Sequence, residues 1–247
     1  MTGPVPGSGH AQLNDTARPC GRCLAPLRKV HALLLLAAVL AAPARAAFED
    51  LGAGARAPGM GNAFTPLADD VYAVHYNPAG LALLTRPELG TSYTRHLIGL
   101  TDNSSIASSF LGYAHPLKKA GAGTVGTAWE SFSLNSGQYK EDAFYLSYGR
   151  PLNEVPDRGN LYGGMNAKYL RRSFGSFPEA ANAMSGISAT GQADPVLAGK
   201  SSVGKLDLDL GFLYRLQRNY SVGLAVDHLA EPNVAFNASD TDKLGRA

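Results

Sequence analysis

The chain has 247 residues, of which 45% are hydrophobic and 17% charged, and its formal net charge is +2. Residues 1–46 hold five of the 22 Lys and Arg but one of the 20 Asp and Glu, which leaves 17 basic against 19 acidic residues in the rest of the chain. A net charge of −2 without a basic stripe argues against nucleic-acid binding.

The N-terminus has the three parts of a secretory signal peptide. Arg28 and Lys29 precede an apolar run over residues 30–42, and Ala44-Arg45-Ala46 supplies the small residues that a signal peptidase recognises. The run is shorter than the ~20 residues that a membrane-spanning helix needs, which disfavours the alternative of an N-terminal anchor. We therefore predict a cleaved signal peptide over residues 1–46 and export across the inner membrane.

Both cysteines, Cys20 and Cys23, lie within this predicted signal peptide. Their C-x-x-C spacing could indicate a zinc or redox site, but no second pair of ligands follows. An exported chain without cysteine suits an oxidising compartment. We expect no metal and no cofactor.

Residues 47–84 differ from the rest of the chain because Gly, Ala and Pro dominate and no regular alternation occurs. We predict short helices and tight turns there. Gly59 and Gly61 fall in one candidate turn, and Asn77-Pro78-Ala79-Gly80 forms another. Small residues would let this segment pack inside a barrel as a plug, and proline sets a turn without needing a donor. The alternative is a loop-rich leader on a soluble domain.

From Leu89 onward apolar residues recur with period two, which predicts β-strands. The clearest stretch runs from Lys205 to Leu216. One face carries Leu206, Leu208, Leu210, Phe212, Tyr214 and Leu216, and the other carries Lys205, Asp207, Asp209, Gly211, Leu213 and Arg215. The remaining strands are predicted at about 89–98, 106–115, 123–133, 144–149, 161–169 and 220–227.

Alternation alone suits a soluble sandwich as well as a membrane barrel, but the lengths of strands and connections favour the barrel. Strands of roughly 9–12 residues can cross a bilayer at a tilt. Short connections alternate with longer polar ones, as periplasmic turns and outer loops do. The short ones lie near 116–121 and 217–219, and the longer ones near 99–105, 134–142 and 173–204. A long connection at 151–160 departs from this pattern.

The two strand faces also differ in composition. Aromatic residues on the apolar face gather near strand ends, as they do at membrane interfaces. Tyr113, Tyr148, Tyr214 and Tyr220 would form one belt, and Phe144 and Tyr169 the other. A base at mid-depth on a lipid-facing position costs about 2–4 kcal/mol. We therefore predict that the charged residues of the opposite face point into the lumen, namely Lys168, Asp207, Asp209, Arg215 and Asp227.

The predicted fold is all-β: an antiparallel up-and-down outer-membrane β-barrel with a short N-terminal helical plug segment. The predicted divisions are a signal peptide (1–46), a plug-like segment (47–84) and a partial transmembrane barrel (85–247). Bacterial single-chain barrels have even strand numbers of eight or more. With about seven strands counted, we expect the chain to be a truncated part of a larger barrel.

The stretch Gly52 to Ala82 resembles a known family. Its pattern Gly-Ala-Arg-Ala-x-Gly-Met-Gly-Asn-Ala-Phe-Thr, followed by Ala-Asp-Asp and Tyr-Asn-Pro-Ala-Gly-Leu-Ala, is similar to the outer-membrane PorV/PorQ proteins. More distantly it resembles the FadL/TodX long-chain fatty acid transporters. The resemblance implies a barrel of about fourteen strands with the N-terminal segment inside it as a plug. Asn77, Pro78 and Gly80 would then lead from the plug into the barrel.

Catalytic motifs are missing from the sequence. Gly199-Lys200-Ser201 has Asp194 where a phosphate-binding loop needs glycine. His75, His96, His115 and His228 are scattered rather than spaced as metal ligands. We expect that the protein is not an enzyme.

Three functions are compatible with the sequence. The leading hypothesis is an outer-membrane channel or transporter for hydrophobic small molecules. The second is an outer-membrane anchor or adaptor in protein secretion or surface assembly. The third is a soluble periplasmic all-β binding protein. The expected partners are outer-membrane lipid and either a hydrophobic ligand or a secretion-system protein.

Overall fold

The computed structural model describes residues 47–48, 51–101, 104–119, 121–135, 138–155, 159–175, 182, 184–185, 187–192, 201–216, 220–236 and 241–246, besides Gly3. Contacts divide the chain into residues 1–44 and 45–247, and the description below concerns the second unit. The predicted signal peptide cleavage site at residues 44–46 and the Gly199-Lys200 pair lie outside the described residues.

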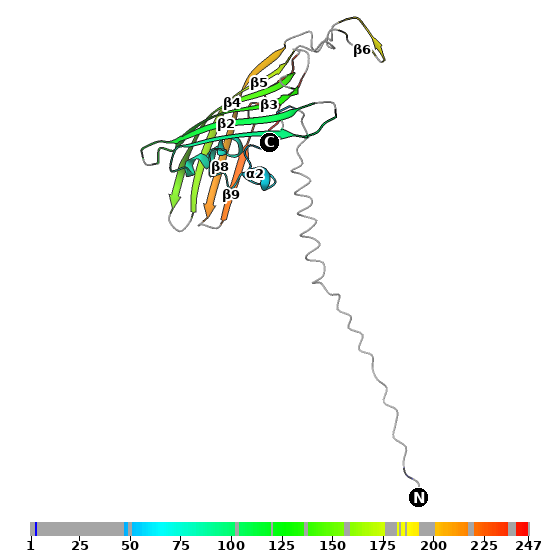
Figure 1. Cartoon of the computed structure of the whole chain (residues 1–247). Helices are drawn as coiled ribbons and strands as arrows, with labels where there is room; N and C mark the ends of the chain where they lie inside the picture. The colour runs from blue at the N-terminus through cyan, green and yellow to red at the C-terminus, as the bar shows by residue number, and fades with distance from the viewer. Residues whose placement is uncertain are drawn as a thin grey trace. The chain divides into compact units, whose positions relative to one another are not determined.

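Seven strands form one antiparallel sheet in which every strand pairs with its neighbour in the order β1-β2-β3-β4-β5-β8-β9. The strands are β1 (Glu88–His96), β2 (Ile106–Pro116), β3 (Thr124–Leu134), β4 (Tyr139–Val155), β5 (Gly159–Phe174), β8 (Ser202–Leu216) and β9 (Tyr220–Val226). A separate two-stranded hairpin joins β6 (Met184–Ser185) to β7 (Ser188–Ala189). Figure 1 shows the large sheet strongly curled. The predicted fold, a partial antiparallel barrel of about seven strands, is confirmed.

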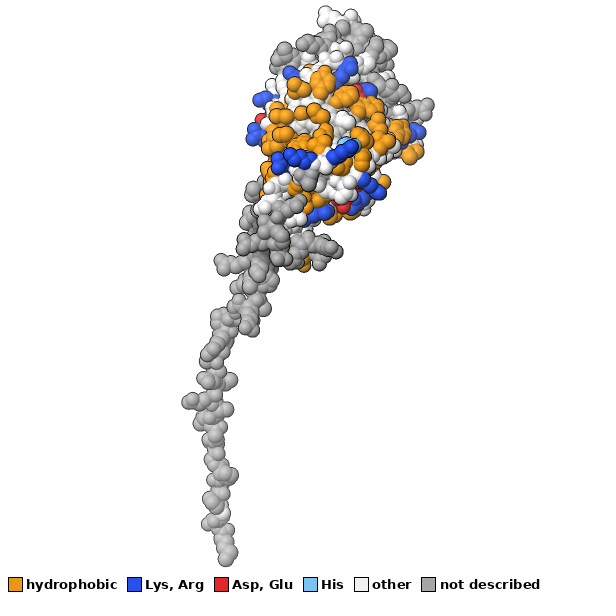
Figure 2. All heavy atoms as spheres, turned by 90° about the vertical axis from the view of Figure 1, so that its left-hand side faces the viewer, with side chains coloured by type: hydrophobic (Ala, Val, Ile, Leu, Met, Phe, Trp, Pro, Cys, Tyr) orange, Lys and Arg blue, Asp and Glu red, His pale blue; other side chains and the backbone are white. Residues whose placement is uncertain are grey.

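Strand β8 shows how the alternating sequence produces two different faces. Leu206 is 76% exposed, whereas the next residue, Asp207, is 1% exposed. We call the face that contacts residues 47–84 the inner face and the opposite one the outer face. Figure 2 shows hydrophobic side chains spread over much of the surface in that view. The exposed large apolar residues on the outer face include Leu89, Leu111, Tyr113, Phe144, Leu146, Met165, Tyr169, Leu206, Leu208, Phe212, Tyr214, Tyr220, Val222 and Leu224.

Two connections are shorter than the sequence predicted. β4 continues to Val155 and β5 begins at Gly159, so most of the loop predicted at 151–160 is paired strand. Pro151 lies where the β4–β5 register shifts, the irregular position at which a sheet tolerates proline. Likewise β4 begins at Tyr139, inside the loop predicted at 134–142. The β4–β5 correction adds a short turn at the end of the sheet opposite the long 175–201 connection, whereas the short β3–β4 connection lies at the same end as residues 175–201 and departs from the predicted pattern of long loops there.

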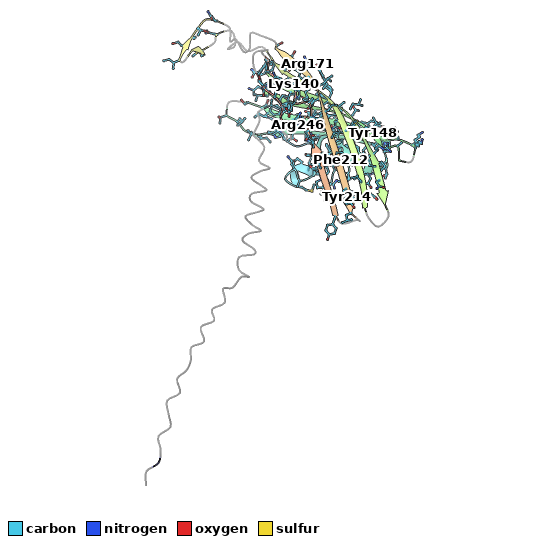
Figure 3. All side chains as sticks on the ribbon, turned by 180° about the vertical axis from the view of Figure 1, so that it is seen from behind. Lys140, Tyr148, Arg171, Phe212, Tyr214 and Arg246 are labelled. Atoms are coloured by element: carbon cyan, nitrogen blue, oxygen red, sulfur yellow. The ribbon has the colours of Figure 1, made fainter. Side chains whose placement is uncertain are left out.

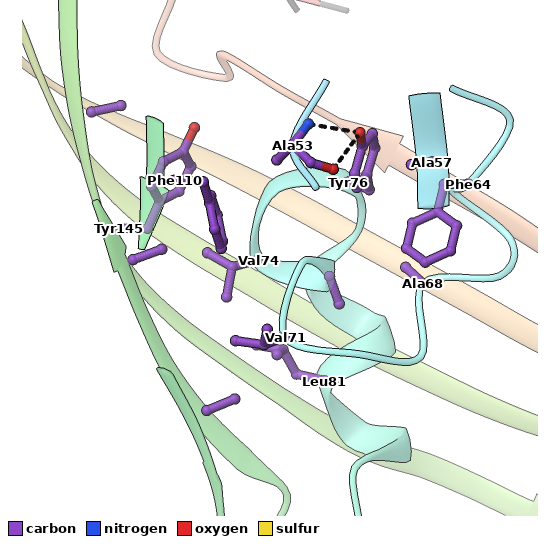
Figure 4. Close-up of a cluster of buried hydrophobic side chains, with 14 of the residues drawn as sticks. Ala53, Ala57, Phe64, Ala68, Val71, Val74, Tyr76, Leu81, Phe110 and Tyr145 are labelled. Atoms are coloured by element: carbon purple, nitrogen blue, oxygen red, sulfur yellow. Dashed lines mark hydrogen bonds between the residues drawn. The ribbon is translucent and has the colours of Figure 1, made fainter. Parts of the chain in front are cut away.

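The plug segment (residues 47–84) contains three short helices, as the sequence predicted. They are α2 (Arg56–Gly59), α3 (Ala73–Tyr76) and the 3-10 helix η1 (Pro78–Leu83). Their apolar side chains pack against those of the inner face, where Phe64, Val74 and Leu81 share one buried cluster with Phe110 and Tyr145 (Figure 4). Two hydrogen bonds hold Tyr76 there: its hydroxyl accepts from the Ala53 N–H at 2.8 Å and donates to the Ala53 carbonyl at 3.1 Å.

After β9 the chain turns away from the regular ladder. His228 and Glu231 have positive φ angles of 56° and 45°, and an isolated bridge joins Asn233 to Lys243. Val234 and Leu244 are buried in the same cluster as the plug segment. In the part of the chain that the structure describes, no helix has the length and apolar character needed to span a membrane.

Candidate functional site

The Asn77-Pro78-Ala79-Gly80 turn lies against the inner face and is held by one fully buried amide. The Asn77 Nδ2 group donates to the carbonyls of Thr65 at 3.0 Å and of Phe212 in β8 at 3.1 Å. Its Oδ1 accepts a hydrogen bond from the Ala79 N–H at 3.1 Å, and so caps η1, with Pro78 in the first turn. A single side chain therefore starts the helix and ties it to the sheet.

Three glycines on adjacent strands make room for this turn. Gly149 of β4 is the cross-strand partner of Gly164 of β5, which in turn pairs with Gly211 of β8. A Cβ atom at Gly149 would lie 2.5 Å from the Pro78 carbonyl oxygen. One at Gly164 would overlap the Pro78 carbonyl carbon, and one at Gly211 would overlap the Asn77 amide oxygen. We call these three residues the glycine row. It lets two backbones approach as no larger residue would.

Polar contacts join the plug segment to five strands. On β1 the Tyr72 hydroxyl donates to the Thr91 carbonyl at 3.1 Å, and on β3 the Glu130 carboxylate lies 3.0 Å from His75 Nδ1. The other contacts are Phe48 N–H to Glu141 of β4 at 3.0 Å, Asn166 Nδ2 of β5 to the Val74 carbonyl at 2.9 Å, and Arg215 of β8 to Asp69 at 3.8 Å. The segment is thus attached across the width of the sheet rather than at one hinge.

A buried ion cluster lies beside the plug segment on β5 and β8. Lys168 is 4% exposed, and its Nζ lies 2.6 Å from Asp209 Oδ1 and 3.7 Å from Asp207 Oδ2. His228 Nδ1 lies 2.5 Å from the same Asp207 oxygen. Asn166 Nδ2 donates to Asp209 Oδ2 at 2.9 Å as well as to the plug segment. Burying these charges is tolerable because each carboxylate has a cationic or hydrogen-bonding partner.

The two carboxylates also hold the chain where it leaves β9. The backbone N–H of His228 donates to Asp209 Oδ1 at 3.1 Å, and that of Ala230 donates to Asp207 Oδ1 at 3.3 Å. These donors have left the regular ladder and would otherwise lack partners. The cluster therefore joins β5, β8, the plug segment and the segment after β9.

Comparison with known families shows which family the chain belongs to. The family described as "Type IX secretion system membrane protein PorP/SprF" matches residues 72–247. The chain belongs to this family. No similarity to a curated protein or to a solved structure was found. The matched region contains the whole sheet and the Asn77–Gly80 turn. The more specific resemblance to PorV/PorQ and FadL/TodX proteins is not confirmed by it.

In this PorP/SprF family member, the five charged residues predicted for the lumen occupy different surroundings. Lys168, Asp207 and Asp209 come together in the buried cluster. Arg215 lies toward the end of β8 and contacts Asp69 of the plug segment. Asp227 lies just beyond β9, half-buried and within electrostatic reach of Asp209 and Lys168.

The predicted turn residues divide in the same way. Asn77, Pro78, Ala79 and Gly80 lie on the inner face, and a Cβ at Gly80 would overlap the Ala68 carbonyl oxygen. Gly59 ends α2, and Gly61 follows it with φ 64°, but a Cβ at either would meet open space. Gly61 is therefore needed for its backbone conformation, while Gly59 has no packing role.

Several residues of the PorP/SprF inner face were not singled out from the sequence. Asn166 shares a strand face with Lys168, and this alternation was the available signal for it. His75, Glu130 and His228 gave no such signal, because their partners lie 55 and 21 residues away in the chain. Within the described residues no group of His, Cys, Asp or Glu is arranged to hold a metal ion.

The rim of the plug segment is more exposed than its centre. Arg56 Nη1 lies 2.5 Å from Asp69 Oδ1 and 3.4 Å from Asp70 Oδ2. Burial raises the pKa of Asp70, and the hydrogen bond from the Tyr72 N–H opposes that rise. Taken together, the inner face of this family member is a packed interface between the sheet and the plug segment.

Proposed function

We propose that this PorP/SprF family member is an outer-membrane barrel component that anchors and adapts proteins of the type IX secretion system, and that it is neither an enzyme nor an open channel. The observation that carries the proposal is the attachment of the plug segment to β1, β3, β4, β5 and β8. A plug that must move aside to open a channel would be expected to have few contacts, near a hinge, whereas this plug segment is attached across the sheet.

The outer face supports a location in a bilayer. On β8 the outward residues from Leu206 to Leu216 are all apolar or aromatic. Ten residue steps span about 33 Å along a strand. At the usual tilt of a membrane barrel this is about 25 Å in height, the thickness of the apolar band of such barrels. A soluble protein rarely exposes so large a continuous apolar surface.

The lengths of the connections between strands indicate which end of the sheet would meet partner proteins. At one end of the sheet β8 and β9 are separated by residues 217–219 and β4 and β5 by residues 156–158, whereas the β5–β8 connection covers residues 175–201. In outer-membrane barrels the short turns lie on the periplasmic side and the long loops outside. We assign the 175–201 end to the cell surface, where secretion-system partners would be met.

A disulfide between the plug segment and the sheet tests the proposal. A Cβ atom at Gly126 of β3 would lie 3.1 Å from Val74 Cγ2, the position that a cysteine sulfur would take. The double variant Val74→Cys/Gly126→Cys should therefore crosslink with little backbone movement. The single variants and the reduced double variant are the controls, and residues 47–247 contain no other cysteine.

The two leading functions predict opposite outcomes for the oxidised variant in cells. An adaptor should still support release of type IX cargo at wild-type level when the plug segment is locked. A channel for hydrophobic compounds should lose uptake of a fluorescent fatty acid on oxidation and regain it on reduction. Uptake that is blocked by the crosslink, with cargo release unaffected by deletion of the gene, would overturn the adaptor proposal.

A further inference from the structure

The outer face changes character near the end of the sheet that we assign to the cell surface. Cross-strand partners there form rows of outward side chains. The last mainly apolar row is Thr91, Leu111, Trp129, Phe144, Tyr169 and Leu206. The next row is Tyr93, Ser109, Ser131, Asp142, Arg171 and Gly204, and the one beyond is Arg95, Ala107, Ser133, Lys140, Ser173 and Ser202. We call Arg95, Lys140 and Arg171 the cationic band.

The three cations of the band are available at the surface. Arg95 and Arg171 are exposed, and among the residues that the structure describes neither guanidinium has a hydrogen bond or an ion pair. Arg172, the next residue along β5, points to the inner face and donates to Tyr139 at 2.8 Å and to Asp242 at 2.6 Å. The two adjacent arginines thus have different roles: Arg172 is paired on the inner face, and the guanidinium of Arg171 is available to bind an anion on the outer face.

Lys140 is held more firmly than the two arginines. Its side chain is 39% exposed, and Nζ lies 3.1 Å from Asp142 Oδ1. The same Nζ lies 5.6 Å from the centre of the Trp129 ring, and the Trp129 indole N–H donates to Asp142 at 3.1 Å. This arrangement fixes an ammonium group directly beyond the apolar row. One acid among three bases leaves the band with net positive charge.

The residues between the cations have small side chains, so no bulky side chain covers the charged groups. Ala107 and Ser133 separate Arg95 from Lys140 in one row, and Gly204 follows Arg171 in the other. The Tyr169 hydroxyl lies over Gly204, so the ring belongs to the apolar row while its polar tip reaches the band. Figure 3 shows Lys140 and Arg171 toward one end of the sheet and Tyr148, Phe212 and Tyr214 farther along it.

We propose that Arg95, Lys140 and Arg171 bind the phosphate groups of a phosphorylated glycolipid, lipid A, in the outer leaflet. Guanidinium groups bind phosphate oxygens in bidentate fashion, and a lysine beside them adds a point charge. The acyl chains of the lipid would lie against the apolar row that ends at Trp129, Phe144 and Tyr169. The inference rests on the proposed outer-membrane location, because the band is a headgroup site only if the apolar rows meet lipid.

Trp129 is the single tryptophan of the chain and reports on this site directly. The full chain would be folded into phosphatidylcholine vesicles containing increasing fractions of diphosphoryl lipid A. We expect a saturable change in Trp129 emission. Lipid A retained by the protein in mild detergent, counted by phosphorus assay after gel filtration, gives a second readout that does not depend on the indole.

A variant that neutralises the band is compared with one matched in charge. Arg95→Gln/Lys140→Gln/Arg171→Gln removes three positive charges from the band. Lys118→Gln/Lys119→Gln/Arg150→Gln removes three exposed charges from the opposite end of the sheet. A base near an anionic lipid surface contributes roughly a fivefold change in binding. The band variant should therefore need on the order of ten to a hundred times more lipid A, and the matched variant should behave like wild type.

The remaining arms separate failure of this inference from failure of the proposed function. Phosphatidylcholine with brominated acyl chains should quench Trp129 if the outer face meets lipid. An unquenched Trp129 would overturn the membrane location, and the inference with it. Quenching together with equal lipid A binding by the two triple variants would overturn the inference alone. Displacement of lipid A by millimolar inorganic phosphate would show that the band binds the free ion and would also overturn it.

Discussion

The inner and outer faces of the same strands differ in almost every property. On β5 the inward residues include Gly164 and Asn166, which contact the plug segment, and Lys168, which is buried in the ion cluster. The outward residues Met165 and Tyr169 are large, apolar and exposed. One alternating sequence therefore serves two environments. The inner face achieves specificity through close backbone approach and paired charges, while the outer face needs only apolar area.

The largest expected effect comes from removing the central cation of the inner face. Lys168→Met would leave Asp207 and Asp209 buried beside each other without the ammonium group, which should lower the free energy of unfolding by about 3–5 kcal/mol. Lys205→Met, an exposed lysine on β8, is the matched control and should change little. Denaturant unfolding in mild detergent, followed by Trp129 fluorescence, measures both. Equal stability of the two variants would show that the ion cluster does not contribute to the free energy of unfolding.

Neutralising the cluster sharpens the same comparison. In Lys168→Met/Asp207→Asn/Asp209→Asn no buried carboxylate is left without a cation, so stability should recover toward wild type relative to Lys168→Met. A triple variant as unstable as Lys168→Met, measured in the same unfolding assay, would mean that hydrogen-bond geometry, not charge, holds the cluster together.

A base on the outer face should be costly only in a bilayer. Leu210→Arg places a charge near the middle of the apolar band, and we expect a loss of about 2–4 kcal/mol in vesicles. Leu216→Arg lies at the end of β8, where the same substitution should cost about 0–1 kcal/mol. Folding equilibria in phosphatidylcholine vesicles measure the gradient. Equal tolerance at both positions would contradict a lipid environment.

A single methyl group tests the glycine row. Gly164→Ala should destabilise the protein by about 1–3 kcal/mol, because the added Cβ overlaps the backbone of Pro78 and that backbone must shift. The control on the same strand is Ala167→Leu, which adds more volume to the exposed outer face. Unfolding midpoints in detergent decide the point. If Gly164→Ala lowered the unfolding midpoint no more than Ala167→Leu does, the glycine row would not be needed for packing of the Asn77–Gly80 turn.

The smallest effect is expected at the rim of the plug segment. Arg56→Gln breaks an ion pair with Asp69 whose side chains are 51% and 36% exposed, so the loss should be below about 1 kcal/mol. The same denaturant titration measures it. A loss of several kcal/mol would show that the rim, rather than the centre, fixes the plug segment.

The sequence was informative wherever period and position suffice. Strand β8 could be predicted because its alternation runs unbroken apart from Leu213, and that residue is buried against Ala79 and Tyr162 on the inner face. The turn at Asn77-Pro78 could be predicted because proline sets a turn without needing a donor. The structure adds that the Asn77 side chain caps η1.

Cross-strand register could not be predicted from one sequence. Gly149, Gly164 and Gly211 are far apart in the chain, and only the pairing of β4, β5 and β8 aligns them. The polar run at the start of β4 and Pro151 near its end suggested loops, although pairing with β3 and β5 carries both as strand. His228 joined the ion cluster because the chain leaves β9 there, and no local pattern marks that departure.

A depth profile along β8 tests most directly whether the outer face meets lipid. Single cysteines at Leu206, Leu208, Leu210, Phe212, Tyr214 and Leu216 would carry a nitroxide spin label in chain folded into vesicles. Collision with oxygen relative to a water-soluble nickel chelate should peak near Leu210 and fall toward both ends. High nickel accessibility at all six positions would place this face in water and contradict the account.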